Sequence, residues 1–590
     1  MYNAFLQAHD GHFGFFPNSV TTLITFGRTT PLVSVSLDGK SVPQPYAYAD
    51  VLTASFGNAT FTPSAIVEIN GQNATEYLLD WSESASALQD RDALYNTLFY
   101  SPAQFSQGLG YGSFSGGDLG ALIYPGSTTT FTFANGTSAT FTNFANVHVP
   151  FDGIESGEDL AKQYLIVPAE AEQNALQAAT STSSTATSAT TSNSRIAISS
   201  TSLASSTSRT KTTLAPGYPT PVIQQSDNLN AGYFLDGEGY EDVAVLAIPS
   251  FFTEADSVAA EFQYVNQQFI ADALAAGKTK LIIDVSANGG GTLLQGYDLF
   301  KQLFPSILPY GATRFRAHEA LNLIGEEASY ISGMYPRRLG VNSTVEPIIQ
   351  SPFNYRTDDD INYEPFTSWA EKYGPHEYGP ANDTFTSIIR WNLSDVLMPD
   401  IFNGQYVSGY LNRSNITVQP FARENIIIVY DGFCASTCNT FTELMTQQGG
   451  VKTIALGGRP NTDIIQAVGG TKGAEDYDYS ELFGYAALTF SFGNDSQQAY
   501  WNTTELGLYT QLPFYTAKIP PTVNARDNIR QGDASETPLQ FVYEPADCRI
   551  FYTPEMVVDE TAVWKTVADT VWNGGDACVA GSNDFYGTGS

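Results

Sequence analysis

The sequence predicts an α/β fold with parallel strands, preceded by a β-rich region. Residues 243–248 and 281–285 are apolar, β-branched runs typical of strands buried on both faces, and an amphipathic stretch over 258–274 separates them. Strand, helix and strand in this order form a parallel unit with a crossover helix. A third apolar run, 426–430, continues the alternation later in the chain. We therefore expect an α/β core over residues 226–475.

The first 170 residues are typical of small antiparallel sheets. Residues 65–69 run into Asn70-Gly71, and 130–133 lead through Asn135-Gly136 into a second alternating stretch. Such dipeptides favour tight hairpin turns. The sequence therefore predicts a β-rich region over residues 1–170.

Three further segments complete the expected organisation of the 590 residues, a length that indicates several domains. Residues 175–225 are rich in Ser and Thr and poor in large apolar side chains, which predicts a flexible linker. A Tyr-rich insertion spans about 310–420, and residues 476–590 are expected to complete the core.

The charge of the chain restricts its partners. With 27 basic and 61 acidic residues, the net charge is −34, which argues against binding to nucleic acid or to anionic membranes. No run of eighteen apolar residues occurs, so no membrane-spanning helix is expected.

The cysteines and glycosylation sequons favour an oxidising compartment. The chain has four cysteines, which suit two disulfides in any of three pairings, and their spacing does not match a zinc site. Ten Asn-x-Ser/Thr sequons favour a secreted glycoprotein. Because the first residues lack the basic and apolar regions of a signal peptide, we expect Met1 to lie inside a longer gene product.

Ser436 is the strongest candidate nucleophile. It follows the apolar run 426–430 and the turn Asp431-Gly432, and it precedes Phe441 and Leu444 at helical spacing. A serine at a helix N-terminus has unpaired backbone N–H groups beside its hydroxyl, as an oxyanion requires. The alternative is that Ser436 is only a helix N-cap.

A glycine turn and a histidine could complete such a site. Residues 288–291, Asn-Gly-Gly-Gly, follow a buried strand but lack the spacing of a nucleotide-binding loop, so they form either a simple turn or an oxyanion hole. Five histidines are available as a general base, and His12 stands in a polar turn before several phenylalanines.

Several motifs, taken in order, resemble the fungal branch of the tail-specific (C-terminal-processing) serine peptidases, which is similar to the chlamydial protease-like activity factor. These motifs are Asp10-Gly11-His12, FTPSAIVEINGQ at 61–72, DVSANGGG at 284–291, GFCASTCNTF at 432–441, GGRPNTDIIQAVGG at 457–470 and FVYEPADCR at 541–549. Their order and spacing fit the family over most of the chain outside the linker and the insertion.

The resemblance implies a crotonase-like (ClpP/crotonase) catalytic core with a PDZ-like part in the β-rich N-terminal region. It implies hydrolysis of peptide bonds through an acyl-enzyme, with Ser436 as nucleophile and His12 as base. The N–H groups of Gly289 or Gly290, together with that of Thr437, would form the oxyanion hole. The implied substrates are proteins or peptides, and no cofactor or metal is implied.

One departure from the family informs the choice of base. Bacterial members use a lysine about twenty-five residues after the serine, and matching Gln466 to their conserved pattern places Thr462 at that position. A Ser/Lys dyad is therefore disfavoured, and a Ser/His pair with a carboxylate is favoured. Three residues remain alternatives for that carboxylate: Glu505, Asp527 and Glu544.

Two functional hypotheses follow. The first is a secreted serine endopeptidase, for which maturation of a ribosomal precursor peptide in fungal secondary-metabolite (mycotoxin) biosynthesis is a specific variant. The second is a non-catalytic peptide-binding member of the same fold. A cysteine nucleophile, Cys434 or Cys438, is disfavoured because a disulfide-bonded sulfur cannot attack. The oligomeric state does not follow from the sequence.

Overall fold

An eight-stranded sheet forms the centre of the computed structural model, which describes residues 2–165, 216–253, 255–379, 381–401, 404–510 and 519–586. Five adjoining strands are parallel, and antiparallel strands flank them at both edges. In spatial order the strands are β10 (Ile223–Gln224), β11 (Ala231–Phe234), β12 (Val243–Ala247), β13 (Lys280–Asp284), β19 (Ile426–Tyr430), β20 (Lys452–Leu456), β23 (Cys548–Ile550) and β24 (Ala580–Gly581). The predicted α/β class is confirmed.

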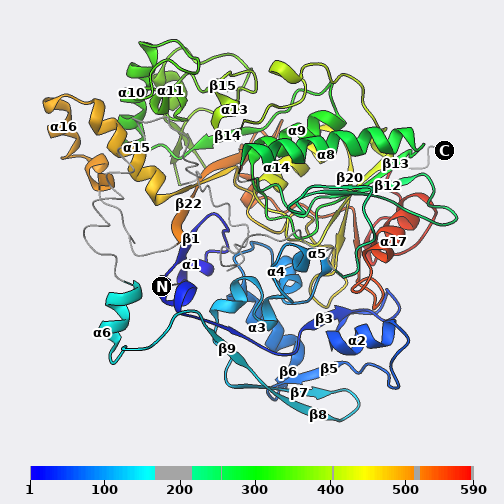
Figure 1. Cartoon of the computed structure of the whole chain (residues 1–590). Helices are drawn as coiled ribbons and strands as arrows, with labels where there is room; N and C mark the ends of the chain where they lie inside the picture. Colours follow the sequence, from blue (N-terminus) through cyan, green and yellow to red (C-terminus); the bar gives the residue numbers. More distant parts are fainter. Residues whose placement is uncertain are drawn as a thin grey trace.

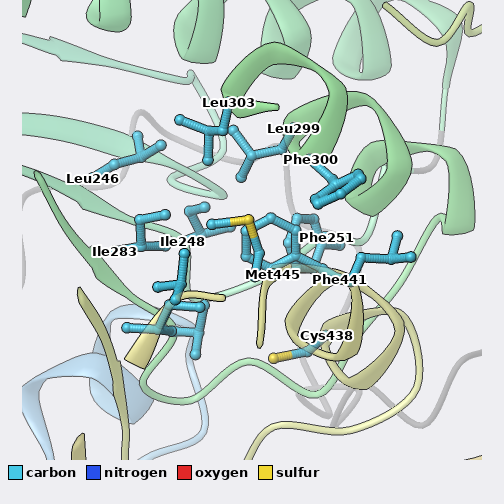
Figure 2. Packing of buried hydrophobic residues seen from close by; sticks show 14 of the residues in the cluster. Leu246, Ile248, Phe251, Ile283, Leu299, Phe300, Leu303, Cys438, Phe441 and Met445 are labelled. Carbon is cyan, nitrogen blue, oxygen red and sulfur yellow. The ribbon is translucent and has the colours of Figure 1, made fainter. Parts of the chain in front are cut away.

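Both faces of the central sheet are covered by helices (Figure 1). The helices α8 (Asp256–Ala275), α9 (Leu293–Leu303) and α14 (Thr437–Glu443) pack on one face, and α17 (Glu560–Trp572) packs on the other. Alternate strand residues enter the two resulting cores, as the continuous apolar runs require. Figure 2 shows Leu246 and Ile283 facing Leu299, Phe300 and Leu303 of α9 in the first core.

The N-terminal region forms three small antiparallel sheets. Asn70-Gly71 lies between paired strands β5 and β6, and Asn135-Gly136 lies between β7 and β8, as their turn chemistry predicts. The sheet strands are β2 (Ile24–Gly27), β3 (Leu32–Val35), β4 (Gln44–Ala47), β5 (Ile66–Ile69), β6 (Gln72–Asn73), β7 (Thr128–Phe133), β8 (Ser138–Thr142) and β9 (Phe144–Val147). The helices α2 (Tyr48–Ser55), α3 (Ala74–Ala85), α4 (Arg91–Thr97) and α5 (Pro102–Ser106) accompany them.

A six-stranded sheet joins segments far apart in the sequence. Its order is β1-β22-β14-β18-β15, and β21 also pairs with β22. Its strands are β1 (Gly14–Phe16), β14 (Ala312–Phe315), β15 (Asp358–Asp360), β18 (Ile389–Trp391), β21 (Glu475–Asp478) and β22 (Ile519–Ile529). Figure 1 shows β1, from the start of the chain, beside β22. Part of the predicted insertion thus shares a sheet with the start of the chain and with strands from residues 475–529.

Further helices surround this second sheet. They are α10 (Glu319–Gly333), α11 (Glu346–Gln350), α12 (Trp369–Tyr373), α13 (Met398–Ile401), α15 (Tyr479–Phe492) and α16 (Asp495–Trp501), while α1 (Tyr2–Leu6) precedes β1 and α6 (Gly157–Leu160) follows the N-terminal sheets. A small hairpin of β16 (His376–Tyr378) and β17 (Asp383–Phe385) completes the insertion. None of the helices in the described ranges is both long and apolar enough to cross a membrane.

The predicted linker of residues 175–225 lies outside the described residues up to position 215. Its last part is ordered, because Ile223 and Gln224 form β10 and pair with β11. The expected boundary at 225 is therefore too late, since the apolar Ile223 already belongs to the central sheet.

The four cysteines form two disulfides, Cys434–Cys438 and Cys548–Cys578. The first encloses Ser436, and the second ties β23 to the segment that leads into the edge strand β24. The structure thus selects one of the three pairings that the sequence left open.

Candidate active site

Ser436 lies at the tight turn between β19 and α14. Its φ and ψ angles are 54° and −119°, and its residue surface is only 6% exposed. A positive φ in a non-glycine residue costs free energy and must be held by surrounding contacts. Here the Ser436 N–H donates to the carbonyl of Thr471 at 2.8 Å, and the Ser436 carbonyl accepts from Thr440 N–H at 3.0 Å. The Ser436 hydroxyl forms no capping hydrogen bond, contrary to a simple N-cap role.

The glycine turn packs directly against Ser436. A Cβ added to Gly290 would lie 2.7 Å from Ser436 Cβ and 3.0 Å from Thr437 N, and the φ of Gly290 is +100°. The N–H of Gly290 donates to Asn288 Oδ1 at 2.8 Å. By contrast, the N–H groups of Gly289 and Thr437 have no hydrogen-bond acceptor among the described residues. Of the two predicted glycines, Gly289 therefore has the N–H free to bind an oxyanion.

Two buried aspartates, Asp284 and Asp431, lie beneath the glycine turn and the turn at Ser436. Asp431 accepts hydrogen bonds from Ala287 N–H at 2.9 Å and Phe433 N–H at 3.0 Å, which links the glycine turn to the Ser436 turn. Asp284 accepts from Trp564 Nε1 at 2.7 Å. Burial raises the pKa of Asp284 and raises that of Asp431 to about 6, with the neighbouring Asp284 charge adding to the effect on Asp431.

The raised pKa of Asp431 predicts a pH-dependent stability. Because the folded state binds this proton more tightly than the unfolded state, where the pKa is near 3.8, the stabilisation is fully present below pH 4. It is lost as pH rises to about 6, and at about 1.4 kcal/mol per pKa unit the loss is about 3 kcal/mol. Urea unfolding of the wild type and Asp431→Asn at several pH values should show a flatter profile for the variant. Parallel profiles would contradict this account.

His12 is brought to the site by the pairing of β1 with β22. Gly14 is opposite Thr522 in this antiparallel pair, which places His12 across from Asn524. His12 Nδ1 lies 3.4 Å from Asn524 Oδ1, and Asn524 Nδ2 donates to Asp10 Oδ2 at 3.1 Å. His12 is only 2% exposed, and its Nε2 has no hydrogen-bond partner in the described part of the chain.

Thr471 connects the histidine turn to the serine turn. Its hydroxyl donates to Asp10 Oδ1 at 2.7 Å, while its carbonyl accepts from Ser436 N–H. A small cavity is lined by His12, Gly289, Ala435 and Thr471 together. The structure thus gathers His12, the glycine turn and the residue preceding Ser436 around one space.

The other histidines have partners elsewhere. His9 contacts Glu83 at 3.2 Å, His148 contacts Thr25, and His376 contacts Ser387. His318 pairs with Glu505 at 3.4 Å.

The three candidate acids do not contact His12. Glu505 faces His318, Asp527 faces Arg314 at 3.4 Å, and Glu544 pairs with Arg530. The group that does face His12 Nδ1 is Asn524, for which the sequence gives no motif.

Other reactive groups near Ser436 are engaged. Lys472 Nζ donates to Gln466 Oε1 and to the Val542 carbonyl, both at 2.8 Å, and burial lowers its pKa. Both sulfurs beside Ser436 are in a disulfide, so neither is a free nucleophile. Over the described ranges, no group of three His, Cys, Asp or Glu side chains is arranged to hold a metal ion.

The chain is similar to known proteins over much of its length. A family model described as a CPAF-like PDZ domain matches residues 25–152, within the predicted β-rich region. The solved structure of mature CPAF is 13% identical, covers 98% of this chain and 88% of its own, and has a TM-score of 0.48, a likeness too low to bear on function.

Two curated fungal relatives carry the family name. The peptidase S41 family protein phomP1' of Diaporthe leptostromiformis is 29% identical, and the alignment covers 96% of this chain and 85% of the relative. The peptidase S41 family protein ustP of Aspergillus flavus is 33% identical, and the alignment covers 62% of this chain and 77% of the relative. The expected family is thereby confirmed: the chain belongs to the peptidase S41 family and is a serine protease.

Proposed function

We propose that this protein is an endopeptidase that cleaves protein or peptide substrates with Ser436 as nucleophile and His12 as general base. The observation that carries the proposal is one small cavity lined by His12, whose Nε2 has no partner among the described residues, by Gly289, whose N–H is free in the same ranges, and by Ala435, which precedes Ser436. These are the parts that acyl transfer through a serine requires.

Each part has a defined role in the proposed mechanism. His12 Nε2 accepts the Ser436 proton as Ser436 Oγ attacks the scissile carbonyl, and the Gly289 and Thr437 N–H groups bind the resulting oxyanion. The imidazolium then protonates the leaving amine. Water then attacks the acyl-enzyme. His12 Nε2 accepts a proton from this water and returns it to Ser436 Oγ as the acyl–oxygen bond breaks.

Asn524 replaces a carboxylate as the group that orients His12 in this proposal. Its Oδ1 faces Nδ1 of His12 at 3.4 Å, so it accepts a hydrogen bond from Nδ1–H in the tautomer that leaves Nε2 free as a base. Asp10 fixes Asn524 through the 3.1 Å bond to its amide. An asparagine serves in this role in papain-like proteases, which supports the assignment.

The finer expectations also remain proposals. The core is crotonase-like and the activity tail-specific, the protein is secreted and glycosylated, and its substrate is a ribosomal precursor peptide of fungal secondary metabolism. The two disulfides and ten sequons support passage through an oxidising compartment.

A fluorophosphonate probe tests the proposal. Wild-type protein should be labelled covalently at Ser436, and Ser436→Ala should not be labelled. Ser332→Ala is a matched control, because Ser332 is a fully buried serine on α10 whose hydroxyl has no partner among the described residues. Labelling that persists in Ser436→Ala would assign the nucleophile elsewhere, and absence of labelling in the wild type would favour the non-catalytic alternative.

The disulfide around Ser436 should matter more for rate than for stability. Cys434 and Cys438 are 4 positions apart, so their disulfide removes little entropy from the unfolded chain, whereas Cys548 and Cys578 are 30 apart. Replacing the first pair by alanine should lower kcat roughly tenfold by loosening the Ser436 turn. Replacing the second pair should cost about 2–4 kcal/mol of stability with little effect on kcat. Thermal unfolding and kcat of both double variants check this, and equal losses of kcat would contradict it.

A further inference from the structure

A second and much larger pocket, the α14 pocket, lies along the helix that follows Ser436. Its volume is about 490 Å³, within the range of roughly 300–1,000 Å³ that is typical of small-molecule sites. Among the described residues, none lines both this pocket and the small cavity beside His12. One wall is a single face of α14 and of the helical turn after it, formed by Asn439, Thr442, Glu443, Thr446 and Gln447.

The charges around the α14 pocket balance one another. Three are positive and three are negative: Arg423, Lys452, Arg530, Glu443, Glu544 and Asp547. Arg530 pairs with both Glu443, at 2.7 Å, and Glu544. Lys452 Nζ pairs with Asp547 Oδ1 at 2.8 Å, and Arg423 is exposed to solvent. A charged ligand would leave its own charge uncompensated here, so the pocket favours a neutral one.

The rest of the wall is rich in neutral groups that form hydrogen bonds. These are the side chains of Tyr430, Asn439, Thr442, Thr446, Gln447, Thr453 and Tyr586. Together with the two carboxylates that Arg530 fixes, they offer both donors and acceptors. A ligand hydroxyl also donates and accepts, so a ligand with several hydroxyls matches this wall, whereas an apolar ligand would leave the wall without partners.

Tyr430 is a buried polar group of this wall that lacks a partner. It is the last residue of β19, it is 1% exposed, and its hydroxyl has no hydrogen-bond partner among the described residues. Burial raises the pKa of this phenol, so it stays neutral and can donate. A buried hydroxyl without a partner costs free energy, and a ligand oxygen that accepts its hydrogen bond removes that cost.

We propose that the α14 pocket binds a neutral sugar through the Tyr430 hydroxyl and the carboxylates of Glu443 and Glu544. Phe585 and Tyr586 add aromatic surface to the pocket, against which the C–H face of a sugar ring can pack. The Tyr586 side chain is fixed, since its hydroxyl donates to the Ile426 carbonyl at 3.0 Å. This binding site goes beyond the proposed endopeptidase function and does not depend on Ser436 being the nucleophile.

Isothermal titration calorimetry tests the proposal on protein made in a host that adds no N-glycans. The probes are the neutral sugars D-glucose, D-mannose and maltose, and the charged analogues glucosamine and glucuronate. At least one neutral sugar should bind with a Kd of about 1 mM or tighter, and the charged analogues of the same ring should bind at least roughly tenfold more weakly. A peptide that carries the bound sugar, compared with the same peptide without it, distinguishes a protein-borne glycan from a free sugar.

Two tyrosine variants locate the binding site. Tyr430→Phe removes only the unpartnered hydroxyl, so the unfolding temperature should stay the same or rise while sugar binding weakens roughly tenfold. Tyr297→Phe is the matched control, because Tyr297 is also 1% exposed with an unpartnered hydroxyl in the described ranges, but it lies on α9 and does not line the pocket. This control should keep the wild-type affinity. Thr446→Val, at a half-buried position of the wall, replaces Tyr430→Phe if the latter does not fold.

The possible outcomes either support or overturn the sugar site. Binding of a neutral sugar, free or on the peptide, that weakens in Tyr430→Phe and not in Tyr297→Phe supports it. No binding of any neutral sugar, equal binding of the charged analogues, equal binding of the peptide without sugar, or an unchanged affinity in the folded pocket variant overturns it. Fluorophosphonate labelling of Ser436 is measured separately, so failure of the proposed endopeptidase function would be seen independently.

Discussion

Ser436→Ala is expected to lower kcat on a peptide substrate by roughly 10⁴- to 10⁶-fold while the unfolding temperature stays near that of the wild type. The reason is that the hydroxyl makes no capping bond, so its removal takes away the proposed nucleophile but no helix cap. His12→Ala should cause a loss of similar size. The double variant should be no slower than either single variant, because both side chains serve one proton transfer.

Steady-state kinetics of the four proteins measure these losses, and the chain offers a close control. His9 lies three residues before His12 and contacts Glu83 and the Leu88 carbonyl, so His9→Ala should retain most of the activity. Losses that multiply in the double variant would show that Ser436 and His12 act independently and would contradict the proposed pair.

Gly290→Ala is the second change with a large expected effect. Its Cβ would stand 2.7 Å from the Ala435 carbonyl and 2.7 Å from Ser436 Cβ, and the φ of +100° is one that alanine rarely adopts. Either Ser436 or the glycine turn must move, and a shift of this kind at the oxyanion hole should lower kcat roughly 10²- to 10³-fold. Because the strain lies in a buried turn, the unfolding temperature should also fall.

Gly532→Ala is a control that separates the steric clash of the added Cβ at Gly290 from the strain of a positive φ. Gly532 also has a positive φ, +78°, but no atom lies within 4 Å of its added Cβ. This control should lose some stability and keep the wild-type kcat. If Gly290→Ala keeps the wild-type kcat as well, the claim that catalysis depends on the close packing of the glycine turn against Ser436 is wrong.

The central sheet and the turn at Ser436 could be predicted because their determinants are local. Continuous apolar runs such as 426–430 belong to strands buried on both faces, and the small residues after Asp431-Gly432 fit the tight turn at Ser436. The hairpins at Asn70-Gly71 and Asn135-Gly136 follow from turn chemistry in the same way.

The remaining parts of the site depend on tertiary pairing, which local patterns do not encode. Asn524 lies in β22, whose sequence has Pro520 and Pro521 near its start and therefore does not predict a strand. It faces His12 only because β1 pairs with this strand. Residue type alone offered Glu505, Asp527 and Glu544, each of which is held by other partners. Likewise, only the Asn288 side chain decides that Gly289 and not Gly290 has the free N–H.

The most direct measurement is a crystal structure of the protein inactivated by a peptidyl phosphonate or aldehyde. The account predicts a covalent bond to Ser436 Oγ, an inhibitor oxygen bound by the N–H groups of Gly289 and Thr437, and His12 Nε2 within about 3.2 Å of Ser436 Oγ or of the leaving-group position. A bond to another residue, or a His12 ring turned away from Ser436 in the adduct, would contradict it.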